Sequence, residues 1–327
     1  MNGMLVDLRF AARNLLRTPG FSLMVVLTLA LGIGATTALF NVVLAVILQP
    51  LPYAEPDRLL HIGHLSAERG PVFSAFSPQD FDDLKTDNKS LSAVAAYMFW
   101  PDQSTTNVMF TSGREQLDPA VLSQDFFSLL AMNPLLGHTF MANESNPGGD
   151  RAVVLSQATW EKLFNSDPAV LGRTLSIDGD PYSVIGVMLG NFAFPAARVQ
   201  IWLPLSFMTE AKIPHLRGVR WLDVVGRLAP GFSADGARSD IDGVLSRLKN
   251  DYRDSNEAWG HSAIVGMRET IIGNTRSALL LSFSAAALVL TTACVNVARS
   301  RKTDYPKRRA PNTGITLAPS ALLKPTT

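Results

Sequence analysis

The sequence is poor in cysteine, and Cys294 is the single one among 327 residues. No disulfide can therefore form within the chain, so hydrophobic packing must hold together any folded domain. Charged residues are also scarce, at 17% of the chain against 47% apolar residues, which is a low proportion for a soluble protein. Charge is missing altogether between Arg17 and Glu55 and again between Arg276 and Arg299. These two gaps indicate a membrane protein.

Familiar catalytic motifs are missing as well. The sequence has no G-x-x-x-x-G-K-[ST] motif, which excludes ATP binding by that type of loop. It has no G-x-S-x-G motif either, because Asp235 stands where the second glycine would follow Ser233, and a helix cap explains this serine better. His61 and His64 are the only close histidines, and in a strand this spacing points them to opposite faces. We therefore predict no catalytic residue, no metal ligand and no bound cofactor.

Two long uncharged segments are predicted as transmembrane helices. Residues 21–48 exceed the roughly 20 residues that a bilayer requires. The second segment, 277–298, has 22 residues and would reach about 33 Å as a helix, against a hydrocarbon core of about 30 Å. A cleaved signal peptide is the alternative for the first segment, but its apolar stretch is longer than such peptides usually carry.

The basic residues predict the orientation of both spans. Lys and Arg are retained on the cytoplasmic side, and they precede the first span and follow the second. Residues 49–276 hold 19 Lys and Arg against 26 Asp and Glu, whereas the two ends together hold 10 against 2. We therefore expect both termini in the cytoplasm and residues 49–276 on the outer side of the membrane. The negative charge of that segment argues against nucleic acid as a partner.

The first 20 residues have the pattern of an amphipathic helix. Arg9, Arg13 and Arg17 lie four residues apart, on the side opposite a face of leucines. Such a helix can lie at the inner membrane interface with its arginines among lipid headgroups. A helix docked on other membrane helices fits the pattern equally well.

Small residues recur along the first predicted span. Ala30, Gly34 and Ala38 lie four residues apart, so they share one helix face where a second helix can approach closely. We predict a helix-packing role for these three residues.

The middle segment mixes short strands with capped helices, which predicts an α+β domain. Serines that precede apolar periodicity are expected to cap four helices, and Asp178-Gly179 predicts a hairpin between strands. Strands are also expected in residues 221–228 and 261–267. The four capping serines are Ser77, Ser123, Ser156 and Ser233.

Two groups of side chains could be functional but have simpler explanations. Asp80, Asp82 and Asp83 follow the first cap, where carboxylates compensate the helix dipole on a solvated face. The five tryptophans could form a binding surface, but core packing is the favoured interpretation. They are Trp100, Trp160, Trp202, Trp221 and Trp259.

Five phrases of the sequence are typical of a known family, and they are LRFAARNLLRTPGFSLMVVLTLALGIGATTALFNVV, AVLSQDFFSLLAMNPLLGHTF, VVLSQATWEKLFNSDPAVLGRTLSIDGDPYSVIGVM, FAFPAARVQIWLPL and WLDVVGRLAPG. These phrases resemble ABC-transporter permeases of the MacB and FtsX type, especially their MacB-like periplasmic core domain. The similarity extends over about residues 1–300.

The resemblance implies a protein of the bacterial inner membrane, with a two-lobed α+β extracytoplasmic domain inserted between two transmembrane helices. It implies a permease subunit that does no covalent chemistry: a separate ABC ATPase binds ATP, and its hydrolysis moves the outer domain. A permease dimer, membrane lipid, and a periplasmic adaptor or cargo are the further partners that it implies.

The end of the sequence departs from that family. The basic tail 299–327 looks disordered, and it replaces the coupling segment and further helices of the family. We therefore expect a chain truncated after the second membrane helix. The alternatives are a two-span sensor or adaptor without transport activity and an anchored extracytoplasmic enzyme, which would need a set of catalytic groups that the sequence does not reveal.

Overall fold

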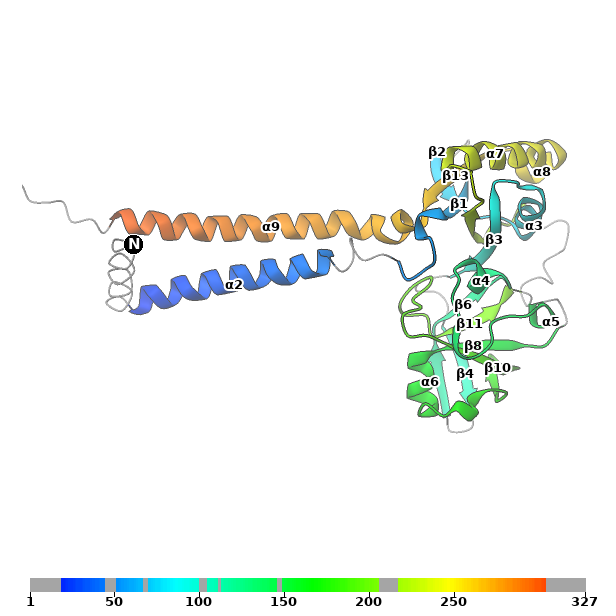
Figure 1. The fold of residues 1–327 in the computed structure, drawn as a ribbon, viewed down its shortest axis with the longest axis horizontal. Helices are drawn as coiled ribbons and strands as arrows, with labels where there is room; N and C mark the ends of the chain where they lie inside the picture. Colours follow the sequence, from blue (N-terminus) through cyan, green and yellow to red (C-terminus); the bar gives the residue numbers. More distant parts are fainter. Residues whose placement is uncertain are drawn as a thin grey trace, which may run out of the picture. The chain divides into compact units, whose positions relative to one another are not determined.

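The structure is a computed structural model of the chain, and it describes residues 19–44, 51–66, 70–99, 105–110, 113–145, 149–205 and 217–303. The chain divides into two compact units. Unit 1 comprises residues 1–46 and 277–327, and unit 2 comprises residues 47–276. Figure 1 shows the labelled elements of both units.

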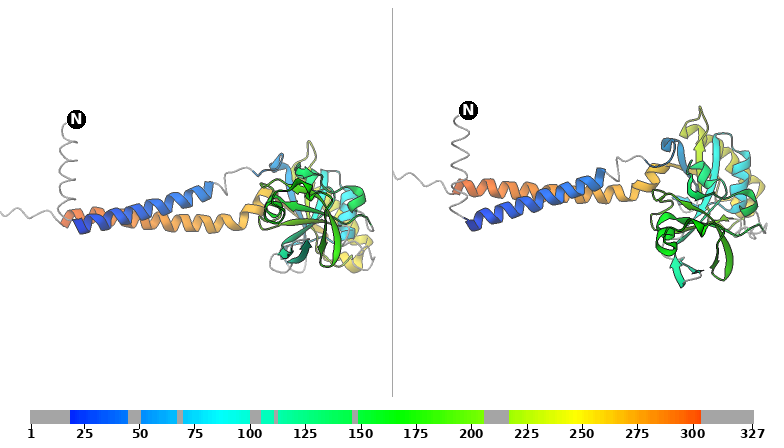
Figure 2. Two further views of the ribbon diagram at one scale, coloured as in Figure 1. Left: turned by 90° about the horizontal axis from the view of Figure 1, so that it is seen from below. Right: turned by 60° about the horizontal axis from the view of Figure 1, so that its bottom comes forward.

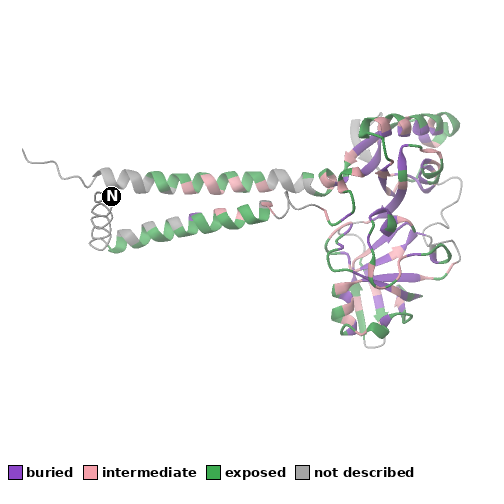
Figure 3. Ribbon diagram, viewed as in Figure 1, coloured by how far each residue is buried: buried purple, intermediate pink, exposed green. Residues whose placement is uncertain are grey.

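Unit 1 contains α2 (Pro19–Val43) and most of α9 (Met267–Thr303). The two helices touch where the Phe40 and Phe283 rings lie 6.3 Å apart and where Gly32 is buried against Leu290. Many described apolar side chains of both helices are exposed, as the green ribbon in Figure 3 shows. Within the described residues, no helix combines the length and the hydropathy needed to cross a bilayer. The two spans stay predictions.

The helix α9 continues through Thr303, so it overlaps the start of the segment 299–327 that was expected to be disordered. The rest of that segment lies outside the described residues, as do the interfacial segment up to residue 18 and Trp100.

Unit 2 is built on one large mixed sheet, which confirms the α+β class. The strand order is β13-β1-β12-β3-β6-β11-β8-β10-β9-β4-β5, with β2 beside β1 and β7 beside β10. The pairs β10/β8 and β11/β6 are parallel, and the other named pairs are antiparallel. The strands are β1 (Leu59–Ser66), β2 (Gly70–Ser74), β3 (Leu91–Met98), β4 (Thr106–Phe110), β5 (Gly113–Leu117), β6 (Pro119–Leu122), β7 (Pro134–Gly137), β8 (Ala152–Ser156), β9 (Thr174–Ile177), β10 (Asp180–Met188), β11 (Ile201–Pro204), β12 (Asp223–Leu228) and β13 (His261–Gly266).

Helices lie at both ends of this sheet. In Figures 1 and 2, the yellow helix α7 lies beside the blue and cyan strands of one end, whereas the green helix α6 belongs to the other end. The α-helices are α3 (Pro78–Asp87), α4 (Phe126–Leu129), α5 (Ala142–Ser145), α6 (Gln157–Phe164), α7 (Ala234–Asp251) and α8 (Arg253–Asn256). Two 3-10 turns cover Pro56–Arg58 and Pro168–Val170.

Three of the four predicted serine caps are confirmed. The hydroxyls of Ser77, Ser156 and Ser233 each accept a backbone N–H in the first turn of α3, α6 and α7, at 3.1 Å in every case. The prediction that Ser123 caps a helix was wrong, because its hydroxyl instead accepts the N–H of Ala96 on β3 at 2.9 Å. The buried N–H of Ala96 requires an acceptor, and Ser123 supplies it through a contact that the local sequence does not show.

The predicted hairpin and strands are confirmed as well. Ile177 of β9 faces Asp180 of β10, so Asp178 and Gly179 alone form the turn. Both have positive φ, at 50° and 97°, as a type I′ turn requires. The strands β12 and β13 occupy the two other regions where the sequence predicted them.

The core of unit 2 has three hydrophobic clusters, which run along the sheet. One lies under α3 and α7, one lies under α6, and the third surrounds Trp202 and the phenylalanines of α4. The purple strands of Figure 3 mark this interior. Trp202 is fully buried, which confirms core packing for it, and Trp160 and Trp221 pack partly buried against two of the clusters.

Candidate functional site: a buried ion-pair network

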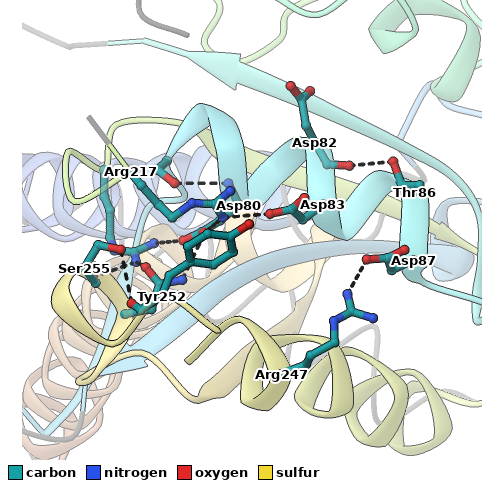
Figure 4. A network of polar contacts seen from close by, with 12 residues as sticks. Asp80, Asp82, Asp83, Thr86, Asp87, Arg217, Arg247, Tyr252 and Ser255 are labelled. Carbon is teal, nitrogen blue, oxygen red and sulfur yellow. Dashed lines mark hydrogen bonds and ion pairs between the residues drawn. The ribbon is translucent and has the colours of Figure 1, made fainter. Parts of the chain in front are cut away.

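The most elaborate polar cluster of the described residues surrounds Asp80, near the start of α3. We call it the Asp80 network, and Figure 4 shows it from close by. It is drawn from β1, α3, the segment 217–222 before β12, and the α8 region. Its members are His64, Asp80, Asp83, Arg217, Arg220 and Asn256.

Asp80 is the centre of this network and is completely buried. Ser77 caps the helix by accepting the N–H of Asp80, which fixes this residue in the first turn of α3. The neighbouring side chains Phe81 and Leu84 enter the hydrophobic cluster beneath the helix. The expectation that all three aspartates lie on a solvated face was therefore wrong for Asp80, because two arginines distant in sequence allow its burial.

Each oxygen of the Asp80 carboxylate has a guanidinium partner. Arg217 Nη1 donates to Oδ1 at 2.6 Å and also to Asp83 at 2.7 Å, while Arg220 Nη1 donates to Oδ2 at 2.6 Å. The amide of Asn256 donates to Oδ1 at 3.0 Å and accepts Arg220 Nη2 at 2.9 Å. Charge-assisted bonds of this kind compensate the cost of taking a carboxylate out of water.

Aromatic rings cover both guanidinium groups. The Arg217 group lies 3.8 Å from the ring centre of Tyr252, and the Arg220 group lies 4.8 Å from that of Trp259. Such stacking stabilises a cation where little water is available. Trp259 therefore shields an ion pair rather than filling an apolar core.

Burial and pairing shift the pKa values of the network in different directions. Burial acts to raise the pKa of Asp80, but Arg220, Asn256 and Arg217 outweigh it and the pKa is lowered. Burial lowers the pKa of Arg220, although Asp80 opposes this effect. Burial, followed by the positive charge of Arg220, lowers the pKa of His64 to about 3. His64 is thus neutral, and its Nε2 accepts from Arg220 Nη1 at 3.2 Å.

This arrangement is suited to holding segments together. Two guanidinium charges balance two carboxylate charges, and the imidazole accepts a hydrogen bond, so each of the six side chains has at least one partner within the network. Among the described residues, no group of three or more His, Cys, Asp or Glu side chains could hold a metal ion. His61 and His64 point to opposite faces of β1, as predicted, since His61 approaches Asp223 at 3.5 Å and His64 approaches Arg220.

The sequence did not reveal the two arginines of the network. Arg217 and Arg220 lie in a short segment without periodicity, and their carboxylate partners are more than 130 residues away in the chain. An unusual run of acidic residues at a helix start was the one available signal, and a solvated face explained that run more simply.

The helix-packing residues lie on α2 and are exposed: Ala30, Gly34 and Ala38. The buried small residue of this stretch is Gly32, where an added Cβ would meet Leu290 Cδ1 at 3.0 Å. Packing of the three exposed residues against another helix stays a prediction. Arg9, Arg13 and Arg17 lie outside the described residues.

A comparison with known protein families shows which family this chain belongs to. The sequence model of the MacB-like periplasmic core domain matches residues 22–244, more than half of the chain. The chain belongs to this family. The match includes α3 and both arginines of the Asp80 network, so most of the network lies within the MacB-like region.

Three solved structures resemble the fold at low sequence identity. The first is the periplasmic region of MacB from Actinobacillus actinomycetemcomitans, at 14% identity and a TM-score of 0.48, with 67% of this chain and 92% of that chain covered. The second is the extracellular domain of the noncanonic ABC-type transporter YknZ from Gram-positive bacteria, at 17% identity and a TM-score of 0.45. The similarity covers 63% of this chain and 99% of that chain.

The third is a domain assigned to a permease protein from Porphyromonas gingivalis, at 14% identity and a TM-score of 0.51, covering 66% and 93%. This last similarity supports the fold of the MacB-like domain. No curated protein matches the chain significantly. The resemblance to permeases of the MacB and FtsX type is thus confirmed, and this family is a permease component rather than a catalytic subunit.

Proposed function

We propose that this chain is the membrane subunit of an ABC-type transporter or mechanotransmission complex. In this proposal a separate ATPase binds and hydrolyses ATP in the cytoplasm, and the permease, as a dimer, moves its MacB-like domain on the outer side. The observation that carries the proposal is the family match over residues 22–244, which begins in α2 and runs through most of the large sheet.

Three features of the chain support this function. The two ends of the chain carry an excess of basic residues, 10 Lys and Arg against 2 Asp and Glu, whereas residues 49–276 hold 19 against 26, which is the asymmetry expected of a protein with cytoplasmic termini. The helices α2 and α9 flank unit 2 in sequence and carry many exposed apolar side chains, which would suit a lipid environment. The Asp80 network joins β1, α3, the segment 217–222 and the α8 region, and such contacts would help this end of the MacB-like domain to move as one body.

A labelling experiment tests the orientation. In a Cys294→Ser background, Ser239→Cys places a thiol on an exposed position of α7, and Ser320→Cys places one near the C-terminus. A membrane-impermeant maleimide should label position 239 in intact cells and position 320 only after permeabilisation. Equal labelling of both positions in intact cells would overturn the proposed topology.

A second experiment tests the partner. We expect the full chain, purified from membranes, to capture an ABC ATPase encoded beside its gene and to change its rate of ATP hydrolysis. The matched control replaces Arg9, Arg13 and Arg17 with glutamine, which should weaken capture if the basic N-terminal segment seats the subunit at the inner surface. Failure of the unaltered chain to capture any such ATPase would contradict the function.

A further inference from the structure

The strand β13 has an unusual position in unit 2. It pairs with β1 through the register Leu60–Gly266 to Leu65–His261, and it ends the strand order of the sheet. Its last residue, Gly266, is followed directly by Met267, the first residue of α9. An edge strand with a free side can be peeled away one hydrogen bond at a time. The strand β13 is thus the edge strand that the chain joins directly to α9.

The outer side of β13 is nevertheless bonded, and its partners come from α7. Asp242 Oδ1 accepts both the N–H and the hydroxyl of Ser262, each at 2.6 Å. Arg238 Nη2 donates to the carbonyl of Ile264 at 3.3 Å. Ser246 Oγ donates to the carbonyl of Gly260 at 3.4 Å, which makes it the weakest of these bonds.

The contact residues are regularly spaced along both the helix and the strand. The α7 residues 238, 242 and 246 are four apart and share one helix face, while their partners 264, 262 and 260 are two apart and share one strand edge. Four helical residues rise about 6 Å, and two strand residues span about 6.6 Å. The helix therefore follows the strand edge in the antiparallel direction, as a neighbouring strand would.

Packing holds this helix face in place. Ile241 and Leu245 of α7 are buried in the same hydrophobic cluster as Ile264 of β13. At the far end, an added Cβ on Gly260 would meet the Lys249 side chain at 2.9 Å, so the chain passes close beneath α7 there. The polar bonds and the apolar contacts thus act between the same two elements.

We propose that Arg238, Asp242 and Ser246 are positioning residues that clamp β13 to α7. We call this set the α7–β13 clamp. It keeps β13 from peeling when α9 is displaced, so the displacement is delivered to α7 and the whole end of the sheet. The clamp rests on the proposed function for its role, but its existence is testable without it.

Hydrogen exchange of the full purified chain tests the clamp itself. Asp242→Ala removes the acceptor of the Ser262 N–H, and we expect exchange across residues 261–266 to rise about 10-fold or more. Asp242→Asn keeps an oxygen at that position without the charge, so it should raise exchange less. Asp240→Ala is the matched control, because this neighbouring carboxylate accepts the N–H groups of Lys89 and Ser90 instead.

The control should loosen the start of β3 and leave β13 protected. Unchanged exchange of residues 261–266 in Asp242→Ala, or an equal rise in Asp240→Ala, would overturn the clamp. This readout does not involve an ATPase, so it is independent of whether the proposed function is right.

The mechanical role has its own readout. The Asp242→Ala variant should still bind the ATPase but lose most of the change in ATP hydrolysis rate that the unaltered chain causes. Asp242→Asn should partly restore this change. If β13 loosens while stimulation stays at the unaltered level, the delivery of motion through the clamp is refuted. If the unaltered chain gives no stimulation, the proposed function fails and the exchange result still decides the clamp.

Discussion

The two ends of the large sheet are held together by different forces. At the end covered by α3 and α7, a hydrophobic cluster is combined with the completely buried carboxylate of Asp80 and its two arginines. At the end covered by α6, the cluster around Val153 and Leu155 is apolar, and the nearby ion pairs, such as Arg173 with Asp167, are exposed. The first end should therefore respond to charge and pH, and the second chiefly to lost volume.

The physical reason lies in the cost of burying charge. A buried ion pair adds little net stability compared with apolar packing, but removing one partner leaves a buried charge unpaired. An exposed pair contributes under about 1 kcal/mol, and salt screens it. Equal numbers of ion pairs at the two ends would thus not mean equal contributions to the stability of the fold.

The largest effect should come from Asp80→Ala. It leaves Arg217 and Arg220 without their shared carboxylate, and we expect the free energy of unfolding to fall by about 3–5 kcal/mol. Chemical denaturation of the purified chain, followed by tryptophan fluorescence, would measure it. Asp87→Ala is the control on the same helix. The Asp87–Arg247 pair in Figure 4 is exposed, so its loss should lower the free energy of unfolding by under about 1 kcal/mol.

If both variants lost a similar amount of unfolding free energy, the cost of burying the Asp80 carboxylate would be compensated by water rather than by the arginines. The contrast between the two ends of the sheet would then disappear.

The next effect is a pH dependence that originates at the first end. The pKa of His64 is about 3 in the folded chain against an ordinary 6.5, so the unfolded chain binds the additional proton between these values. Stability should therefore fall as pH falls from about 6.5 toward 3, by up to about 1.4 kcal/mol per pH unit. The lowered pKa of Asp80 acts in the same direction at the acid end of this window, because its stabilisation is lost as pH falls through the folded value.

His64→Gln should flatten this slope between pH 6.5 and 5, since glutamine can still accept a bond from Arg220 but does not titrate. Leu155→Ala should lower stability at every pH by about 2–5 kcal/mol and keep the unaltered slope. Denaturation midpoints at pH 7, 6 and 5 would compare the three proteins. An identical slope in all of them would show that His64 is not the responsible group.

The smallest effect should be the same at both ends. Ser156→Ala and Ser233→Ala each remove a helix cap, one on α6 and one on α7, and each should cost about 1 kcal/mol. Thermal unfolding would measure both variants, with Ser239→Ala on an exposed face of α7 as the control. Clearly unequal costs would show that tertiary contacts dominate the caps as well.

The sequence by itself determined the local features of this protein. Three serine caps, the Asp178-Gly179 turn and the strands β12 and β13 depend on residues within a few positions of one another, so a linear pattern contains them. The family phrases are local in the same sense, and they led to the family that the comparison confirmed.

Only the tertiary structure decided which polar residues meet. Ser123 bonds β3 rather than its own helix, Asp80 is buried because Arg217 and Arg220 reach it, and Asp242 bonds the edge of β13. Each of these contacts joins segments that the chain places 20 to 140 residues apart. A charged or hydroxyl side chain has the same local pattern whether water or a distant segment satisfies it, so the sheet order and helix placement had to be known first.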